Sequence, residues 1–240
     1  MQLSRQQKNT VTSMSLENII FVPMRSGSKS IKDKNIKLFS GYPLFHWGVT
    51  EALKSNCFDE IIVSTDSLRY GQMVCDHFSN DKIKIDLRPV SLAADETSTE
   101  DVLLEFFSRE PQYEQCLCIL HQITSPFVKA ENFAEIVRLY KSGNYDTLLS
   151  GVVFKRFIWD QQVNPLNYVP IERPRRQDMQ DYYCENGALY AFGVKAFNEH
   201  RSRLFGEIGM VEMPEDSLIE LDEPRDWMIA EKLFEDIRNA

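Results

Sequence analysis

Short β-branched runs alternate with amphipathic segments along most of this chain, and this alternation limits the folds open to it. Strands are predicted near residues 19–22 and at 61–64, 82–87, 116–122, 147–153 and 187–194. Helices are predicted at 43–55, 67–77, 99–107, 130–142 and 224–237. Regular alternation of strand and helix predicts a mainly parallel sheet with helices on both faces, so the fold class is α/β.

A loop of small residues with basic side chains follows the first strand. It reads Pro23-Met24-Arg25-Ser26-Gly27-Ser28-Lys29. Backbone N–H groups of such a loop can approach phosphate oxygens closely while the cations neutralise their charge. Gly27 stands alone, so the loop is neither a Walker A nor a dinucleotide motif. Since ligands bind at the carboxyl ends of strands in open α/β sheets, we interpret it as an anion site rather than a basic surface turn.

The charge balance narrows the choice of partners. A formal net charge of -9 argues against nucleic acid or an anionic membrane surface as the main partner. An acidic chain that binds an anionic ligand must gather its cations locally. Two clusters do so, one at Arg25, Lys29, Lys32, Lys34 and Lys37, the other at Arg173, Arg175 and Arg176.

The cysteines and the first residues indicate a compartment. The 5 cysteines show no spacing typical of zinc ligands, so we expect reduced thiols. The chain has no apolar run of membrane-spanning length, and residues 1–15 lack the apolar core of a signal peptide. We expect a disordered leader at 1–15, one domain at 16–240, and a cytoplasmic location, or a nuclear one in a eukaryote.

Residues 154–184 break the regular pattern. The segment carries Pro165, Pro170 and Pro174, several aromatic residues and an arginine cluster. A stretch of this length seldom forms a free loop within a compact domain. We therefore expect it to be an extension that packs on another surface, such as a second subunit.

Further motifs follow the predicted strands. They are Ile62-Val63-Ser64-Thr65-Asp66, Arg88-Pro89 with Leu92-Ala93-Ala94-Asp95, Leu120-His121-Gln122-Ile123-Thr124-Ser125-Pro126, Glu185-Asn186-Gly187-Ala188-Leu189-Tyr190, and Glu220-Leu221-Asp222-Glu223-Pro224-Arg225-Asp226-Trp227. In this order and spacing they resemble the acylneuraminate cytidylyltransferases, or CMP-sialic acid synthetases, over residues 19–231. Arg173-Pro174-Arg175-Arg176-Gln177-Asp178 before Glu185-Asn186-Gly187 resembles the sialic acid branch most.

The resemblance implies a reaction and an assembly. CTP and a nine-carbon 2-keto sugar acid, such as N-acetylneuraminate, would give a CMP-sugar and pyrophosphate with the help of Mg²⁺. The implied fold is a Rossmann-like, three-layer nucleotidyltransferase fold. The implied assembly is a homodimer in which the extension at 154–184 crosses to the partner and helps complete its active site.

The resemblance also implies which residues bind CTP. They are Arg25, Ser26, Gly27, Ser28, Lys29, Asn35, Arg88, Ala93 and Ala94. Arg25 and Lys29 would also be catalytic, because cations at this place stabilise charge on the departing pyrophosphate. Asn35 would support the loop or contact a phosphate. Arg88 and the backbone of Ala93 and Ala94 would read the cytosine.

Binding of the sugar acid and the metal is implied in the same way. The sugar-binding residues would be Gln122, Thr124, Arg175, Arg176, Asn186 and Tyr190. Arg175 or Arg176 would meet the sugar carboxylate, since a guanidinium binds a carboxylate through two parallel hydrogen bonds. Glu220 and Asp222, two apart on an extended segment, would point the same way and share Mg²⁺, with Asp222 also catalytic.

Three positions depart from the family pattern. Glu220 stands where Asp is usual, so its role as a metal ligand is less secure than that of Asp222. Ile123 stands where Pro is common, and Met24 where a small residue is usual.

Other residues have structural interpretations. We expect His121 to be a packed core histidine, Asp226 a helix cap and Trp227 a core residue. Thr65-Asp66 can cap the helix at 67–77. The remaining histidines lack companions at ligand spacing, which argues against a zinc site.

Alternative functions stay open. The acceptor could be legionaminic, pseudaminic, KDN or KDO acid. The chain could instead be a catalytically silent nucleotide-binding protein or a purely structural dimer module. Measuring CTP binding with and without Mg²⁺ separates these two classes from an enzyme.

Overall fold

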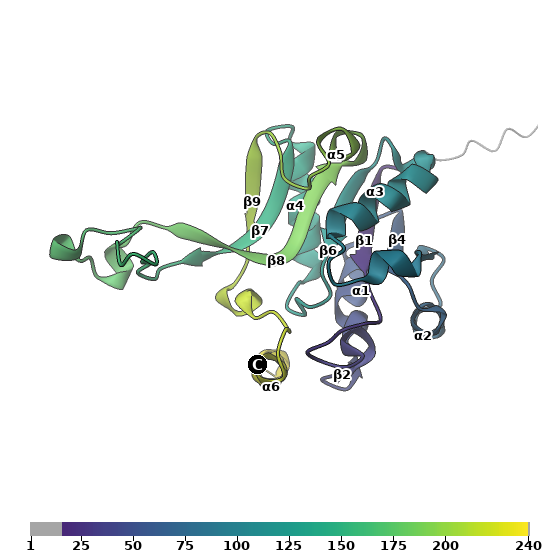
Figure 1. The fold of residues 1–240 in the computed structure, drawn as a ribbon, viewed down its shortest axis with the longest axis horizontal. Helices are drawn as coiled ribbons and strands as arrows, with labels where there is room; N and C mark the ends of the chain where they lie inside the picture. The colour runs from purple at the N-terminus through teal and green to yellow at the C-terminus, as the bar shows by residue number, and fades with distance from the viewer. Residues whose placement is uncertain (1–15, 240) are drawn as a thin grey trace, which may run out of the picture.

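A seven-stranded sheet forms the body of the protein in a computed structural model that describes residues 16–239 (Figure 1). Its order is β5-β4-β1-β6-β8-β7-β9. The strands are β1 (Asn18–Pro23), β4 (Glu60–Thr65), β5 (Ile83–Leu87), β6 (Leu117–His121), β7 (Thr147–Phe154), β8 (Tyr182–Gly193) and β9 (Ile208–Glu212). β8 runs antiparallel to both of its neighbours and the other pairs are parallel. The predicted α/β fold with a mainly parallel sheet is confirmed, while the leader expected at 1–15 lies outside the described residues.

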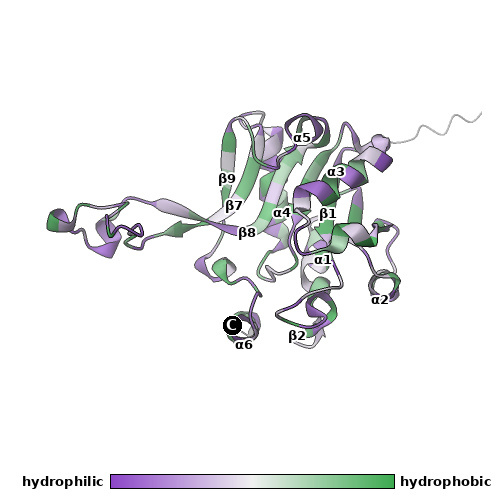
Figure 2. Cartoon of the chain, in the orientation of Figure 1, coloured by the Kyte–Doolittle hydropathy of each residue, from purple (hydrophilic) through white to green (hydrophobic). Residues whose placement is uncertain are grey.

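Helices cover both faces of the sheet. The helices are α1 (Leu44–Ser55), α2 (Leu68–His77), α3 (Thr99–Arg109), α4 (Ala130–Lys141), α5 (Val194–His200) and α6 (Pro224–Asn239). Alternate side chains of β1 serve the two faces: Ile20 packs in the cluster that contains α1, α2 and α4, and Phe21 in the cluster that contains α3 and α5. Because helices cover both faces of the sheet, the central strands are continuous apolar runs, as Figure 2 shows.

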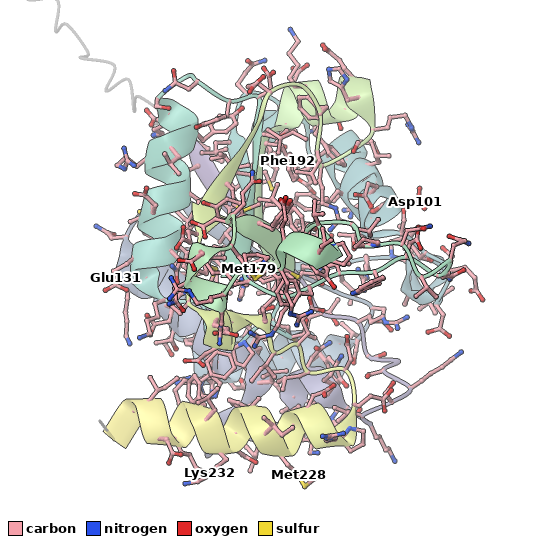
Figure 3. All side chains as sticks on the ribbon, turned by 90° about the vertical axis from the view of Figure 1, so that its left-hand side faces the viewer. Asp101, Glu131, Met179, Phe192, Met228 and Lys232 are labelled. Carbon is pink, nitrogen blue, oxygen red and sulfur yellow. The ribbon has the colours of Figure 1, made fainter. Side chains whose placement is uncertain are left out.

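The last helix forms a separate layer below the body. Trp227 of α6 packs against Phe39 of the β2–β3 hairpin, whose strands are β2 (Leu38–Phe39) and β3 (Tyr42–Pro43). Figure 3, viewed toward the end of the molecule where β7 and β8 project, shows Met228 and Lys232 on the outer side of this helix. Trp227 is therefore a core residue, as expected, and Asp226 accepts a hydrogen bond from the backbone N–H of Glu223 at 2.9 Å in the helix's first turn.

β7 and β8 continue beyond the body as a two-stranded ribbon that carries an arm (Figure 1). The prediction of an irregular extension is wrong at its ends, because Phe154 of β7 pairs with Tyr182 of β8. Between the strands lie one isolated bridge, Trp159 to Pro165, and two short 3-10 turns. We call residues 155–181 the arm.

Two general expectations concern the thiols and the membrane. All five cysteines are free, and burial raises the pKa of the Cys118 thiol. In the part of the chain that the structure describes, no helix combines the length and the apolar character needed to cross a membrane.

A histidine on the central strand β6 packs directly against a helix. His121 is fully buried, its Nδ1–H donates to the carbonyl oxygen of Ala188 at 3.2 Å, and burial lowers its pKa to about 4. This confirms a packed core histidine. Gly48 of α1 lies so close that a Cβ there would overlap the imidazole Nε2.

We expect Gly48→Ala to destabilise the fold by about 1–3 kcal/mol, although Ala favours a helix, because the added methyl forces the packed imidazole aside. Urea unfolding measures the change. Gly27→Ala is the matched control, since a Cβ at that position meets no atom within 4 Å. A Gly48→Ala protein as stable as the parent would show that the core can absorb the methyl.

Candidate active site

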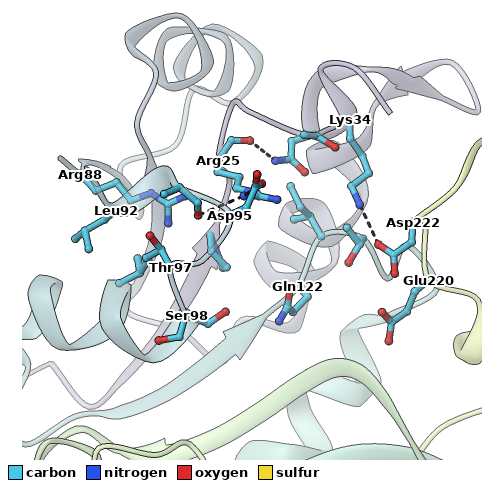
Figure 4. A pocket seen from close by; sticks show the side chains of 18 residues that line it. Arg25, Lys34, Arg88, Leu92, Asp95, Thr97, Ser98, Gln122, Glu220 and Asp222 are labelled. Atoms are coloured by element: carbon cyan, nitrogen blue, oxygen red, sulfur yellow. Dashed lines mark hydrogen bonds and ion pairs between the residues drawn. The ribbon is translucent and has the colours of Figure 1, made fainter. Parts of the chain in front are cut away.

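A cavity of about 320 Å³ lies at the carboxyl ends of β1 and β6 (Figure 4). This is the edge where ligands bind in open α/β sheets. Eighteen residues line the cavity. Those predicted from the sequence are Arg25, Ser28, Asn35, Arg88, Ala94, Gln122, Thr124, Glu220 and Asp222.

The basic loop after β1 is held in place by hydrogen bonds from distant elements. Asp66 accepts from the backbone N–H of Ser26 at 2.8 Å and from its hydroxyl at 2.6 Å. Asn35 donates from Nδ2 to the carbonyl oxygen of Arg25 at 2.8 Å, which supports the loop. Burial alone would raise the pKa of Asp66, but the hydrogen bonds from Ser26 lower it. The prediction that Thr65-Asp66 caps α2 is wrong, since Ser67 accepts the capping bond from the backbone N–H of Tyr70.

Asp95 lies between the two cations predicted to bind phosphate. Arg25 Nη1 is 2.9 Å from Asp95 Oδ1, and Lys29 forms a second ion pair with the same carboxylate. The hydrogen bonds from Lys29 and Arg25 lower the pKa of Asp95. Arg25 and Asp95 line the cavity, whereas the Lys29 side chain is 80% exposed and lies outside it. The loop therefore presents two cations that can converge on one anionic group.

Arg88 is a buried cation on the same side of the cavity as Arg25 (Figure 4). It is 5% exposed, and its Nε has no hydrogen-bond partner among the described residues. Burial lowers its pKa, and the negative charges of Asp66 and Asp86 oppose this shift. Leu92 lies beside Arg88 (Figure 4), and Ala94 also lines the cavity, while Ala93, the last residue of the 3-10 turn Val90–Ala93, does not. A buried donor without a partner is suited to bind a polar ligand.

Two carboxylates face these cations across the cavity. Lys34 Nζ is 3.2 Å from Asp222 Oδ1 and donates to the carbonyl oxygen of Leu221 at 2.7 Å. Burial, and then the neighbouring Asp222, raise the pKa of Glu220. Gly187 has a φ of 66°, and a Cβ there would meet Glu220 Oε1. Within residues 16–239 no group of three or more His, Cys, Asp or Glu side chains could hold a metal ion, so these carboxylates form a pair only.

A second cavity, of about 480 Å³, adjoins the first. Gln122 and Glu220 line both. Tyr190 donates a short hydrogen bond to Glu185 Oε1, and burial followed by this bond raises the pKa of Tyr190. The other residues that line this second cavity are Gly187, Arg203 and Leu204.

Comparison with known proteins shows the family. A family model described as "Cytidylyltransferase" matches residues 19–226. The chain belongs to the cytidylyltransferase family. The recognition made from the motifs is confirmed by relatives that carry the name N-acylneuraminate cytidylyltransferase.

N-acylneuraminate cytidylyltransferase A of Danio rerio is 33% identical over 87% of this chain and 48% of its own length. The N-acylneuraminate cytidylyltransferase of Oncorhynchus mykiss is 30% identical, with the same shares covered. The chain thus spans about half the length of these two relatives. CMP-N,N'-diacetyllegionaminic acid synthase of Legionella pneumophila is 27% identical over 89% of this chain and 94% of its own length.

A solved structure shows the same fold. The structure of CMP:2-keto-3-deoxy-manno-octonic acid synthetase complexed with CTP matches with a TM-score of 0.64 and 18% identity. The match covers 92% of this chain and 99% of that one. The sheet and its helices therefore have the same fold as that synthetase.

Several predicted site residues of this cytidylyltransferase lie outside both cavities. Arg175 and Arg176 are on the arm, where they pair with Asp178 at 2.6 Å and Glu215 at 3.5 Å. Asn186 is buried, accepts from the Ser150 hydroxyl at 2.6 Å and donates to Ser217 at 2.9 Å. The others are Ser26, Gly27, Lys29 and Ala93.

The structure also adds residues that the sequence analysis did not assign to a site. Asp95, Thr97, Ser98 and Thr99 line the first cavity, and Arg203 lines the second. Asp95 belongs to a quoted motif and Lys34 to a noted cluster, so both carried some indication. Arg203 lies in an irregular segment that carries no motif.

Proposed function

We propose that this protein transfers CMP from CTP to the anomeric hydroxyl of a nine-carbon 2-keto sugar acid, releasing pyrophosphate. The observation that carries the proposal is the pair of adjoining cavities that share Gln122 and Glu220. One cavity offers cations to a triphosphate and the other offers polar groups to an acceptor. The names of the relatives point to N-acetylneuraminate or a close relative as that acceptor.

In this proposal the first cavity binds CTP. Arg25 and Lys29 exchange the Asp95 carboxylate for the triphosphate and stabilise the charge that develops on the departing pyrophosphate. Ser28 and the backbone at Ser26 and Gly27 would add hydrogen bonds to phosphate oxygens. The unpartnered Arg88 guanidinium, with the backbone beside Ala94, would donate to and accept from the edge of the cytosine.

The two carboxylates suit a hard divalent cation. Mg²⁺ commonly binds through one or two carboxylates together with substrate phosphates, so the Glu220 and Asp222 pair fits it. Burial, and then the neighbouring Asp222, raise the pKa of Glu220, and such a cation would favour its ionised form. When bound, Mg²⁺ would neutralise the α-phosphate and lower the pKa of the sugar hydroxyl. Lys34 already pairs with the Asp222 carboxylate at 3.2 Å.

The second cavity would receive the acid. Gln122 and Thr124, after β6, lie where the two substrates would meet, and Tyr190 forms part of the far wall. A second candidate is the same transfer to a legionaminic acid, because the chain covers nearly the whole of the Legionella relative that carries that name.

We also propose a homodimer, built through the arm. The arm projects away from the sheet and its helices (Figure 1). Several large apolar side chains of the arm are exposed. They are Trp159, Val163, Leu166, Val169 and Ile171. Such a surface marks an interaction site. In a dimer, Arg175 or Arg176 would reach the partner's second cavity and meet the sugar carboxylate there. A cytoplasmic location agrees with the free cysteines.

Pyrophosphate release tests the proposed function. The purified chain is mixed with Mg²⁺, CTP and, in turn, N-acetylneuraminic, KDN, legionaminic, pseudaminic and KDO acids. We expect release with a nine-carbon acid, and none when UTP replaces CTP. CTP binding without release from any acid would indicate a silent nucleotide-binding protein. No CTP binding at all would indicate a structural dimer module.

A further inference from the structure

Arg203 is a cation of the second cavity that no motif predicted. It lies in the irregular segment between α5 and β9. Among the described residues that line this cavity, it is the single positive charge, facing Glu185 and Glu220. Arg203 lines the second cavity only, whereas Gln122 and Glu220 line both. It is therefore at the end of the cavity away from the predicted phosphate site.

Two contacts fix the guanidinium group. Nε donates to Glu100 Oε1 at 2.6 Å and Nη2 donates to Oε2 at 3.1 Å, so the pair is bidentate. Cζ lies 4.7 Å from the ring centroid of Tyr190, which places the cation over an aromatic face. The Arg203 and Glu100 side chains are mostly buried, at 20% and 24% exposure. Nη1 bonds to no described residue, so the fixed group retains N–H donors for a ligand.

The charge around Arg203 decides which ligand atom it suits. Glu100, outside the cavity lining, offsets its positive charge, and the two lining carboxylates, Glu185 and Glu220, make the cavity negative as a whole. A carboxylate group would be repelled there, while an uncharged oxygen can accept a hydrogen bond. In a 2-keto sugar acid the carboxylate and the anomeric hydroxyl are bonded to the same carbon atom, so both belong at the end next to the CTP cavity, where the proposed function places Mg²⁺ on Glu220 and Asp222 and an arm arginine beside the carboxylate. The part of the acid that reaches Arg203 is its tail.

We propose that Arg203 is a specificity-determining residue whose N–H donates to an uncharged oxygen on the tail of the acid, an acylamino carbonyl or a hydroxyl. Glu100 and Tyr190 hold the guanidinium in the position that this contact needs. The inference rests on the proposed function, since it concerns the acceptor of that reaction.

Steady-state kinetics of Arg203→Met and Arg203→Lys test the proposal. We expect the KM for N-acetylneuraminic acid to rise roughly 10- to 100-fold in Arg203→Met, the loss typical of a hydrogen bond from a charged group. The KM for CTP should stay within about threefold, because Arg203 lies outside the CTP cavity. The preference for N-acetylneuraminic over KDO acid should fall. Arg203→Lys keeps the positive charge but loses the planar guanidinium group. It replaces Arg203→Met as the test if the methionine variant does not fold.

Glu100→Gln separates recognition from a purely structural link. It removes the charge and one acceptor from the pair that holds the guanidinium, so the KM for the acid should rise, though less than in Arg203→Met, while the KM for CTP stays within about threefold. If the pair only links α3 to the loop, Glu100→Gln and Arg203→Met will raise both KM values alike, which overturns the proposal. Arg138→Met, in the exposed pair with Glu135 on α4, is the matched control and should change neither KM.

The two proposals fail in different ways. A parent protein that releases pyrophosphate, with an Arg203→Met variant of unchanged KM for every acid, overturns the role of Arg203 alone. A parent protein that releases none from any acid overturns the proposed function and this inference with it.

Discussion

Replacing Asp222 with Asn is expected to lower pyrophosphate release on the order of 10³-fold while the fold stays intact. The Asp222 carboxylate is 65% exposed toward the cavity and can bind a divalent cation together with the α-phosphate. The amide has the same shape but no charge, so it loses metal affinity and several kcal/mol of transition-state stabilisation. The measurement is kcat with CTP and the preferred acid at saturating Mg²⁺.

Glu223→Gln is the matched control for this variant. It neutralises the next carboxylate along the chain, which is exposed and lines neither cavity. We expect it to be as active as the parent. CTP binding in the absence of Mg²⁺ should persist in Asp222→Asn, since the loop cations and Arg88 are untouched. An Asp222→Asn enzyme of normal turnover would refute the assignment of Asp222 as metal ligand.

The double variant Arg175→Met and Arg176→Met is expected to lose activity on the order of 10²-fold, through loss of the guanidinium that pairs with the sugar carboxylate. In the described chain these residues belong to the arm and line neither cavity. A partner subunit with an intact arm should therefore restore the lost activity. Co-expression with Asp222→Asn under a second affinity tag, and purification over both tags, isolates mixed dimers. One of the two sites in each should be complete, giving about half the parent activity.

A second mixed dimer gives the opposite result and serves as control. One chain carries all three substitutions and its partner carries none. If the arm acts on the other subunit, each site then holds one defect and activity is lost. If the arm acts on its own body, this second mixture keeps about half the activity and the first mixture none. Failure to isolate any mixed dimer would contradict the dimer itself.

The strands and helices that could be predicted are those whose own side chains face the core. β1 and β6 are buried on both faces, and α4 repeats its apolar positions with the helical period, so local pattern and final burial agree. α5 has 7 residues, too few for a period to stand out. β9 lies at the sheet edge and pairs with β7 only, and Gly209 interrupts its short apolar stretch from Ile208 to Val211.

The residues of the site divide along a similar line. Arg25, Gln122 and Asp222 each follow a recognisable motif and line the cavity. The sequence predicts that Asp66 caps the helix that follows it, because only residues adjacent in sequence can be compared. In the structure Asp66 binds Ser26, which is 40 positions away. The contact of Arg203 with Glu100 spans 103 positions and belongs to no motif. Such pairs exist only after the chain has folded.

Asn186 belongs to a motif whose Glu185, Gly187 and Tyr190 line the second cavity, whereas its own side chain does not. The β7–β8 register shifts between Leu149 and Gly151, beside Asn186 and the left-handed Gly187. The irregularity leaves Asn186 buried against Ser150 and brings Gly187 up to Glu220. The sequence motif does not indicate where a bulge forms or which way it turns a side chain.

β8 has a consequence for the mechanics of the molecule. The strand that leaves the arm at Tyr182 runs unbroken through Glu185 and Tyr190 of the second cavity to Gly193. At about 3.3 Å per residue, the extended stretch from Tyr182 to Glu185 sets the distance from the root of the arm to the cavity wall. The tip of the arm can gain or lose residues without effect on that spacing. A single residue added between Tyr182 and Gly187 would turn every side chain before it to the opposite face, and the reach of the arm and the shape of the cavity would change together.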